Sequence, residues 1–337
     1  MKNHPLERFP MKISVIVPAY NCEKTLALCL KAVCHSVYND FELIVVDDGC
    51  TDRTREIAKQ YTNNIVVHPK RTNPFEARLS GANASNGDVF AFVDSDVVIS
   101  PGTLENIGSY FSANKDIRAL TGLLSKEHPS HRFFSQYKNL YMNHIFNQLP
   151  DRVTFLYGSI FALRKTLLKE LDFKYEGAED TALGQFLHRR GEPIAFLRNL
   201  QVLHLKEYGF LSWIRNDFRT SYLWARLFLK YGGWKQLKKG KAGFAHSPKT
   251  QIASIGLVFL TLVSLPVAIY VPAFFVLDLF PLSLWFLFNM AFFSFLKSEK
   301  GAFFATIGVV CTFIDHIVMG LGIVTGFFSA LFLPLNS

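Results

Sequence analysis

The eight residues Val89–Asp96, VFAFVDSD, run five apolar residues directly into two carboxylates that are one position apart. A continuous apolar run of this length predicts a strand buried on both faces of a sheet. Two carboxylates so close repel each other unless a cation lies between them. The stretch therefore predicts a buried strand that delivers Asp94 and Asp96 to a metal site.

Three further apolar runs precede this stretch, at 12–20, 41–49 and 64–68, and segments with helical spacing or helix-start signals lie between them. Such alternation predicts an α/β fold with a parallel, doubly wound sheet. Ligands of such sheets bind beyond the carboxyl ends of the strands. The polar residues expected at that edge are Asn21, Asp47, Asp48, Asp94 and Asp96.

The chain from residue 101 to 209 is expected to complete this domain, so that it covers residues 1–209. A helical stretch from about residue 101 is followed by expected strands at 117–125 and 153–164. The segment AEDTALGQFLHRRGE predicts a helix with two acids at its start, where the helix dipole favours them. PIAFL and LQVLHL predict two short closing strands.

Positive charge is concentrated in residues 210–249, which carry nine Lys and Arg against one acid, so that they account for +8 of the formal net charge of +9. A basic block before apolar tracts is typical of a cytoplasmic juxtamembrane segment that anionic lipid attracts. Nucleic-acid binding is the rival explanation of the basic charge, and this segregation argues against it. The five cysteines show no metal-type spacing and indicate a reducing compartment.

Within this block, residues 210–231 have apolar residues at helical spacing and a basic stripe of Arg215, Arg219, Arg226 and Lys230. The stripe, together with Trp213 and Trp224, predicts an amphipathic helix at the membrane interface. An ordinary surface helix is the alternative.

Residues 250–337 are expected to form a transmembrane region. Apolar tracts at 252–272, 276–296 and 303–332 predict about three spans, and the catalytic face would then be cytoplasmic. Asp315 and His316 lie within the last tract, where ionisable residues are functional candidates by default. A polar contact between helices explains them equally well.

Four motifs, SVIVPAYN, VVDDGCTD, GDVFAFVDSD and GAEDTALGQFLHRRG, occur in this order in the chain. As a set, they resemble the inverting family 2 glycosyltransferases over roughly residues 12–205. The resemblance implies a GT-A domain that binds a nucleotide sugar with Mg²⁺ or Mn²⁺ and transfers the sugar to an acceptor. The apolar tail is similar to that of members acting at the cytoplasmic face of a membrane, which implies a lipid or lipid-linked acceptor.

The resemblance also assigns roles to individual residues. Asp180 matches the general base, and Glu179 beside it would orient the acceptor or raise the pKa of the base. Asp96 is the expected metal ligand, together with Asp94 and with His204 as a further candidate, although a structural histidine is equally compatible. The residues expected to bind the nucleotide sugar are Pro18, Tyr20, Asn21, Asp47, Asp48, Arg78, Asp94, Ser95, Arg215 and Arg219.

Two features bear on the acceptor. The chain lacks the Gln-x-x-Arg-Trp motif of processive synthases and has IRNDFRTSYLW instead, which disfavours polymer extrusion. A phosphate acceptor needs no general base, so the Glu-Asp pair favours a hydroxyl acceptor over a polyprenyl phosphate. A transporter or scaffold that only binds nucleotide, and a nucleotidyltransferase, are the remaining alternatives. Asp94, Asp96 and Asp180 argue against the first, and the absence of a glycine-rich loop after the first strand argues against the second.

Overall fold

The computed structural model describes residues 11–173, 177–234, 247–271 and 273–332. The chain forms two compact units, each with its own core. The first comprises residues 1–129, 151–175 and 179–206, and the second comprises residues 130–150, 176–178 and 207–337.

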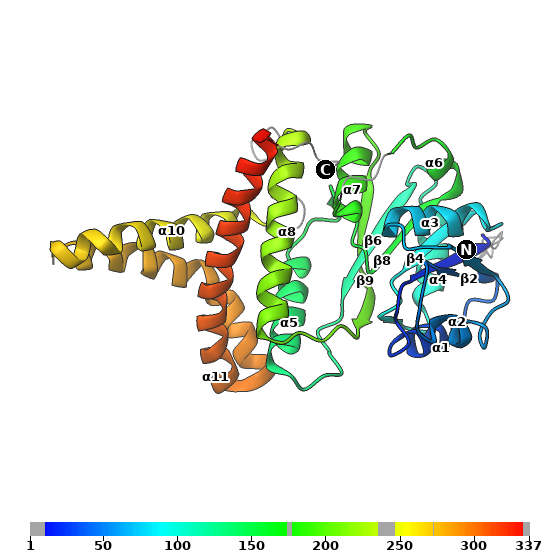
Figure 1. The fold of residues 1–337 in the computed structure, drawn as a ribbon, viewed down its shortest axis with the longest axis horizontal. Helices are drawn as coiled ribbons and strands as arrows, with labels where there is room; N and C mark the ends of the chain where they lie inside the picture. Colours follow the sequence, from blue (N-terminus) through cyan, green and yellow to red (C-terminus); the bar gives the residue numbers. More distant parts are fainter. Residues whose placement is uncertain (1–10, 174–176, 235–246, 272, 333–337) are drawn as a thin grey trace, which may run out of the picture. The chain divides into compact units, whose positions relative to one another are not determined.

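The first unit is built on one mixed sheet, whose strands appear with their helices in Figure 1. Its main path runs β3-β2-β1-β4-β8-β6-β9-β5, and β7 pairs with β9. The strands are β1 (Ile13–Ala19), β2 (Phe41–Asp47), β3 (Ile65–Val67), β4 (Val89–Val93), β5 (Val97–Ile99), β6 (Ala119–Leu124), β7 (Arg152–Val153), β8 (Ile160–Arg164) and β9 (Ile194–His204).

The four N-terminal strands are parallel, as the sequence predicts. Among them, β1 and β4 are the most buried strands, and every residue of β4 is buried. Both strands lie inside the sheet, between other strands. The carboxyl ends of β1, β2 and β4 therefore carry Tyr20, Asp48 and Asp94 to one edge of the sheet.

The second half of the sheet differs from the sequence prediction. The stretch expected as a strand at 153–164 is irregular between two short strands, β7 and β8. The two expected closing strands are one continuous strand, β9, that pairs antiparallel with β5. β5 itself was not predicted, because three residues are too few to show a period.

The helices of the first unit lie between its strands in the chain. They are α1 (Leu26–Cys34), α2 (Thr54–Ala58), α3 (Pro74–Asn83), α4 (Thr103–Ala113), α6 (Lys165–Lys169) and α7 (Glu179–Arg189). Helix α3 begins at Asn73, whose side chain accepts a hydrogen bond from the Glu76 backbone N–H at 2.9 Å. This cap fixes the helix that carries Arg78.

The second unit is helical. Its described helices are α5 (Phe133–Asn147), α8 (Phe210–Lys230), α10 (Lys249–Tyr270) and α11 (Ala273–Phe332). Helix α5 was not predicted and lies in sequence within the expected 1–209 domain, yet it packs on α8 and α11. Its Phe133 ring packs at a tilt against Phe304, with 4.5 Å between the ring centroids, and its Tyr137 hydroxyl contacts the Thr312 hydroxyl at 2.9 Å. The expected boundary at residue 209 therefore needs correction for residues 130–150.

Helix α8 occupies the residues of the expected amphipathic helix, but one of its two tryptophans does not lie where the sequence predicts. Trp213 is fully buried and stacks with Phe134, so it does not lie at a lipid interface. Arg226 of the expected basic stripe is also buried and donates to the Tyr222 hydroxyl at 3.0 Å. Arg215 and Arg219 are exposed. Residues 235–246, which hold four of the nine basic residues of the block, lie outside the described part of the chain.

Helices α8 and α11 approach each other closely. A Cβ on Gly322 would lie 2.6 Å from the Phe218 carbonyl oxygen, and one on Gly326 would lie 2.4 Å from the Tyr222 carbonyl oxygen. Small residues four positions apart let two helix backbones meet in this way, a mode common among helices in membranes.

Helices α10 and α11 contain stretches that are long and apolar enough to cross a membrane, Lys249–Pro266 and Leu279–Phe332. Figure 1 shows α10 (yellow) beside the first part of α11 (orange), after which α11 turns and runs along α8. The turn lies at Gly301, which has a non-helical φ of 84°. The three expected spans thus correspond to α10 and to the two parts of α11, and their number as membrane crossings stays a prediction.

Candidate active site

Asp96 and His204 are brought together by the pairing of β5 with β9. Val97 lies opposite His204 in this pair, and the Leu205 backbone N–H donates to the Asp96 carbonyl oxygen at 2.8 Å. The two side chains consequently meet, with 3.4 Å between His204 Nε2 and Asp96 Oδ2. The structure thus places the third candidate ligand, His204, beside the expected metal carboxylate.

Arg78 connects the carboxylates at the sheet edge to the start of α7. Its Nη2 donates to Asp94 at 2.6 Å, and its Nη1 donates to Glu179 at 2.8 Å. The residue is only 5% exposed, and among the described residues its Nε has no hydrogen-bond partner. The expected contact of Arg78 with a nucleotide therefore stays a prediction, whereas its bridge between two carboxylates is part of the fold.

Asp180 is held at the N-terminus of α7. Its Oδ2 accepts a hydrogen bond from the Gly158 backbone N–H at 2.9 Å, and its Oδ1 accepts one from the Thr181 N–H at 2.6 Å. A Cβ on Gly158 would lie 3.1 Å from Asp180 Oδ2, so a glycine there permits the contact. Ala178, two residues earlier, has a positive φ of 42°. Such strain in a non-glycine residue is found most often at functional sites.

Helix α7 itself is fixed by close packing. A Cβ on Gly184 would lie 2.3 Å from the Phe155 Cα, so the helix backbone rests directly on the segment before Gly158. The Leu156 N–H also donates to the Asp180 carbonyl oxygen at 3.3 Å. These contacts set the position of Asp180 relative to Gly158.

The acids of the site differ in their pKa values. Burial raises the pKa of Asp180 to about 6, and the negative charge of Glu179 adds to the rise. Burial also raises the pKa of Asp94 to about 6, against the opposing charge of Arg78. For Asp96, burial acts in the same direction, but the hydrogen bond and charge of His204 together with the charge of Lys206 outweigh it, and the pKa is lowered. A carboxyl with a pKa near neutrality is suited to accept a proton.

Asp47 and Asp48, expected to hold the base and the ribose, have protein partners. Asp47 is fully buried, accepts from the Cys50 N–H at 2.8 Å and pairs with Arg55. Asp48 is 5% exposed and accepts from His68 Nδ1 at 2.8 Å and from the Thr72 hydroxyl at 2.7 Å. Both side chains shape the loops after β2 and β3, and their contact with a nucleotide stays a prediction.

The loop after β1 presents the more accessible groups. Tyr20 is 40% exposed, and the Arg71 guanidinium lies 4.1 Å above the centre of its ring. Asn21 has a positive φ of 46°, and its side-chain oxygen accepts from the Thr51 N–H at 2.8 Å. Pro18 near the end of β1 is half-buried. A stacked tyrosine and a cation form a surface suited to a base or a phosphate.

Sequence analysis did not identify three groups of this region. Arg71 lies in an irregular loop, and the backbone N–H of Gly158 has no side-chain signature. Lys206, whose charge helps to lower the pKa of Asp96, follows β9 by two residues.

Ser95 lies where expected, between Asp94 and Asp96, and is half-buried. The remaining two expected ligands, Arg215 and Arg219, lie on α8 in the second unit.

The donor set fits a hard divalent cation that takes most of its ligands from substrate. No group of three or more His, Cys, Asp and Glu side chains in the described ranges is arranged to hold a metal. Asp96 and His204 nevertheless offer an oxygen and a nitrogen 3.4 Å apart, about the spacing of two neighbouring ligands bound at roughly 2.1 Å. Asp94 already pairs with Arg78, which makes Asp96 the better candidate ligand of the two.

Comparisons with known proteins agree with this geometry. Residues 14–172 match the profile of Glycosyl transferase family 2. The poly(ribitol-phosphate) beta-N-acetylglucosaminyltransferase TarS of Staphylococcus aureus is 29% identical over 50% of this chain and 31% of its own length. The minor teichoic acid biosynthesis protein GgaB of Bacillus subtilis is 27% identical over 63% of this chain and 23% of its own length. The chain thus spans less than a third of either relative.

The structure is also similar to the mannosyltransferase PcManGT of Pyrobaculum calidifontis, solved with GDP-Man and Mn²⁺. The TM-score is 0.57 at 15% identity, over 98% of this chain and 91% of that one. The likeness establishes a shared fold and agrees with the expected GT-A class. Residues 14–172 thus form a Glycosyl transferase family 2 domain, and the chain joins this GT-A domain to apolar C-terminal helices.

Proposed function

We propose that this chain is a membrane-anchored, inverting glycosyltransferase. It transfers a sugar from a UDP- or GDP-sugar to a hydroxyl group of a lipid or lipid-linked acceptor, with Mg²⁺ or Mn²⁺. The observation that carries the proposal is the position of Asp180. Its carboxylate is half-buried, has a pKa of about 6, and is joined through Glu179 and Arg78 to the Asp94 end of the acidic pair.

The donor half of the site comprises the carboxyl ends of β1, β2 and β4. Asp96 and His204 would hold the cation there. When bound, the cation would offset the negative charge of the diphosphate leaving group. Tyr20 and Arg71 are the accessible groups for the nucleotide. Asp94 contributes through Arg78, because that ion pair fixes the strand end from which Asp96 extends.

The acceptor half comprises the start of α7 and the Gly158 segment. Asp180 takes the proton of the acceptor hydroxyl as its oxygen attacks the anomeric carbon. The Gly158 and Thr181 N–H groups orient the carboxylate, and Arg78 pairs with the neighbouring Glu179. Attack on the face opposite to the leaving diphosphate inverts the anomeric configuration.

The membrane assignment is supported by the apolar stretches of α10 and α11, by the close glycine-mediated packing of α8 on α11, and by the basic residues between 210 and 249. Positive charge beside the spans supports a catalytic unit on the cytoplasmic side. GgaB is named for minor teichoic acid biosynthesis and TarS for transfer to poly(ribitol-phosphate), which supports a polyol-phosphate or related acceptor of the cell envelope.

The second candidate is a polyprenyl-phosphate glycosyltransferase. Its acceptor is already an anion, so Asp180 would have no proton to remove. The raised pKa of Asp180 favours the hydroxyl acceptor, because a carboxyl that titrates near neutrality serves proton transfer. A non-catalytic nucleotide-binding membrane protein is the third candidate, and the presence of both Asp96 and Asp180 argues against it.

The test uses membranes that contain the full chain, a panel of radiolabelled UDP- and GDP-sugars, and Mn²⁺. After incubation, organic solvent separates lipid-linked label from free sugar. The proposal predicts organic-phase label from one donor, which mild acid does not release as the free monosaccharide and which is lost in Asp180→Asn and in Asp96→Ala.

Asp116→Asn is the matched control and should retain transfer, because Asp116 lies in the turn after α4 rather than at the sheet edge. Label that mild acid releases as the free monosaccharide would instead identify a phosphate acceptor. Transfer that Asp180→Asn leaves unchanged would refute the base assignment. If intact nucleotide binding accompanies no transfer from any donor to lipid or polymer, the chain is a binding protein.

A further inference from the structure

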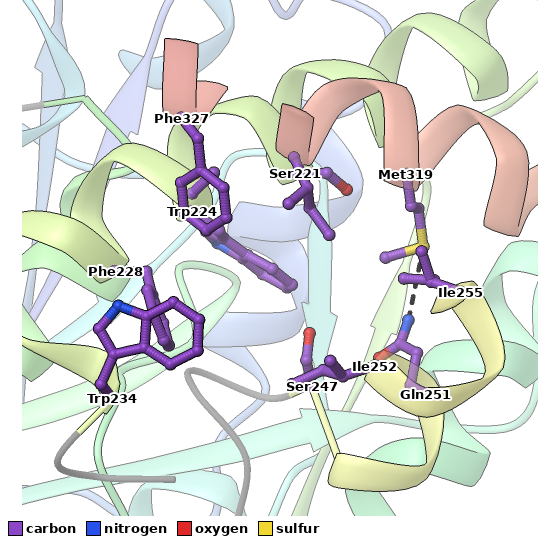
Figure 2. A pocket seen from close by; sticks show the side chains of 12 residues that line it. Ser221, Trp224, Phe228, Trp234, Ser247, Gln251, Ile252, Ile255, Met319 and Phe327 are labelled. Atoms are coloured by element: carbon purple, nitrogen blue, oxygen red, sulfur yellow. Dashed lines mark hydrogen bonds between the residues drawn. The ribbon is translucent and has the colours of Figure 1, made fainter. Parts of the chain in front are cut away.

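A pocket of about 170 Å³ lies between α8, α10 and α11 in the second unit. Figure 2 shows the aromatic side chains of Trp224, Phe228 and Phe327 gathered on one side of it, and Met319 and Ile255 on the other. The pocket is separate from the residues assigned to glycosyl transfer.

The side chains that line the pocket offer few hydrogen-bonding groups to a polar ligand. Gln251 directs its amide nitrogen to the Tyr141 hydroxyl and to the Met319 sulfur. The Ser221 hydroxyl is buried and has no hydrogen-bond partner among the described residues. An apolar cavity of this kind excludes water and binds apolar molecules. The chemistry of the pocket therefore suits a hydrocarbon chain and does not suit a nucleotide or a sugar.

The source of such a chain follows from the helices that form the pocket. Leu260 and Val263 of α10 are 56% and 72% exposed, and Phe328 of α11 is 64% exposed. In the membrane placement proposed above, on which this inference rests, these side chains face lipid. A dry hollow beside them would then be filled by a chain of the surrounding bilayer.

The charge near the pocket indicates the headgroup. Helix α10 begins at Lys249, two residues after the pocket residue Ser247. A helix N-terminus attracts phosphate through its free N–H groups and its dipole. Lys230 is exposed at the end of α8, two residues after the pocket residue Phe228, whereas Arg226 is buried and donates to the Tyr222 hydroxyl. With nine basic residues against one acid between 210 and 249, this part of the chain favours an anionic headgroup.

We propose that the pocket holds one hydrocarbon chain of an anionic phospholipid of the bilayer, with the lipid phosphate at the N-terminus of α10. The bound lipid fills the space between α8, α10 and α11 and thereby stabilises their packing. Anionic lipid would then be a specific ligand of the second unit, in addition to any general attraction to the basic surface.

The test measures tryptophan fluorescence of the full chain in nanodiscs of phosphatidylcholine. Brominated acyl chains quench tryptophans that they contact. Two of the chain's four tryptophans, Trp224 and Trp234, line the pocket. At equal mole fraction, brominated-chain phosphatidylglycerol should quench the tryptophan fluorescence more than brominated-chain phosphatidylcholine does. Because two of the four tryptophans line the pocket, this quenching can remove up to about half of the emission.

Ile252→Phe narrows the pocket and should abolish the excess quenching by phosphatidylglycerol. Leu260→Phe is the matched control: it makes the same kind of change on the same helix at an exposed position outside the pocket, and it should retain the excess. Near-ultraviolet circular dichroism checks that both variants keep their packing.

Equal quenching by the two lipids in the wild-type chain, or an excess that persists in Ile252→Phe, would overturn the proposal. Displacement of the excess by unlabelled polyprenyl phosphate but not by unlabelled phosphatidylglycerol would assign the pocket to a lipid-linked acceptor instead. Sugar transfer assayed in the same nanodiscs tests the proposed activity separately, and failure of the chain to enter nanodiscs would refute the membrane placement.

Discussion

The buried Arg78 and the half-buried Glu179 form an ion pair across 101 positions of sequence, with 2.8 Å between Nη1 and Oε1. The same guanidinium also pairs with Asp94, so that one side chain joins α3, the end of β4 and the start of α7. Desolvation opposes the charge on Arg78, but the two carboxylates outweigh it and its pKa is raised.

Arg78→Gln should therefore affect both stability and activity. It leaves Asp94 and Glu179 without their cation, and breaking a buried pair in this way costs about 3–5 kcal/mol of unfolding free energy. Urea denaturation measures the loss. Arg118→Gln is the control, because Arg118 also bridges two acids, Glu170 and Glu192, but is more exposed. Equal losses in the two variants would contradict the special role of Arg78.

The rate of sugar transfer should depend on the ionisation of Asp180. Its pKa is raised to about 6, and only the carboxylate form accepts a proton. The value of kcat/KM should consequently rise with pH through about 6 and level off above 7. Asp180→Asn should lose this limb and reduce kcat by about 10²–10⁴-fold, the usual contribution of a general base. A pH profile of wild-type and variant enzyme at saturating Mn²⁺ checks this, and an unaltered acidic limb in the variant would contradict it.

Asp180→Asn should also change the stability of the protein in a pH-dependent manner. Because the folded-state pKa is raised above the ordinary value of 3.8, the stability that Asp180 contributes is full below about pH 3.8 and falls as pH rises through 6. The neutral amide avoids this loss. The variant should thus be more stable than wild type at pH 8, by up to about 3 kcal/mol, and this advantage should disappear near pH 4. Thermal unfolding at the two pH values measures the difference, and an advantage that is the same at both would contradict the assignment.

Metal dependence should follow Asp96 and His204. His204→Asn removes a candidate nitrogen ligand, and the Mn²⁺ concentration for half-maximal nucleotide binding should rise by roughly 10–100-fold if His204 holds the cation. Chelation of the metal should abolish the difference between wild type and variant. His68→Asn is a demanding control, since His68 also meets an aspartate, at 2.8 Å, but one that is only 5% exposed. Unchanged Mn²⁺ dependence in His204→Asn would remove this residue from the site.

The contact of Gly184 with Phe155 predicts a positional effect on catalysis. Gly184→Ala requires α7 to move away from the Phe155 Cα, and overpacking of this kind costs about 1–3 kcal/mol. The displaced helix carries Asp180, so kcat should fall while donor affinity is retained. Gly102→Ala is the control, because no atom lies within 4 Å of a Cβ at that position. Wild-type kcat in Gly184→Ala would show that the position of α7 is not limiting.

The parts of the fold that could be predicted from sequence are those with local signals. The apolar runs of β1, β2 and β4 and the acids that follow them are contiguous in the chain, so the sheet edge with Asp94 and Asp96 was evident. The pairing of Arg78 with Glu179 could not be derived, since it depends on two helices that are remote in sequence.

Helix α5 escaped prediction for a different reason. Its buried face includes Lys138, Asn139 and Asn143, so polar residues interrupt the expected apolar period. Lys138 is accommodated because it pairs with the buried Asp217 of α8, 79 positions away. Burial lowers the pKa of Lys138, but the charges of Asp217 and Asp315 outweigh it and the pKa is raised. A helix whose buried polar residues depend on such a distant partner cannot be recognised from the apolar pattern of its own segment.

The place of α5 in the chain has a consequence for biosynthesis. A ribosome completes α5 more than sixty residues before α8 begins and over a hundred residues before α10. Until those helices emerge, the aromatic side chains of α5, including Phe133 and Tyr137, lack the surface on which they pack in the finished protein. Domains usually fold in order from the N-terminus. Residues 130–150 cannot complete their packing until the last hundred residues have been synthesised. Folding of the second unit therefore depends on the synthesis of its apolar C-terminal helices.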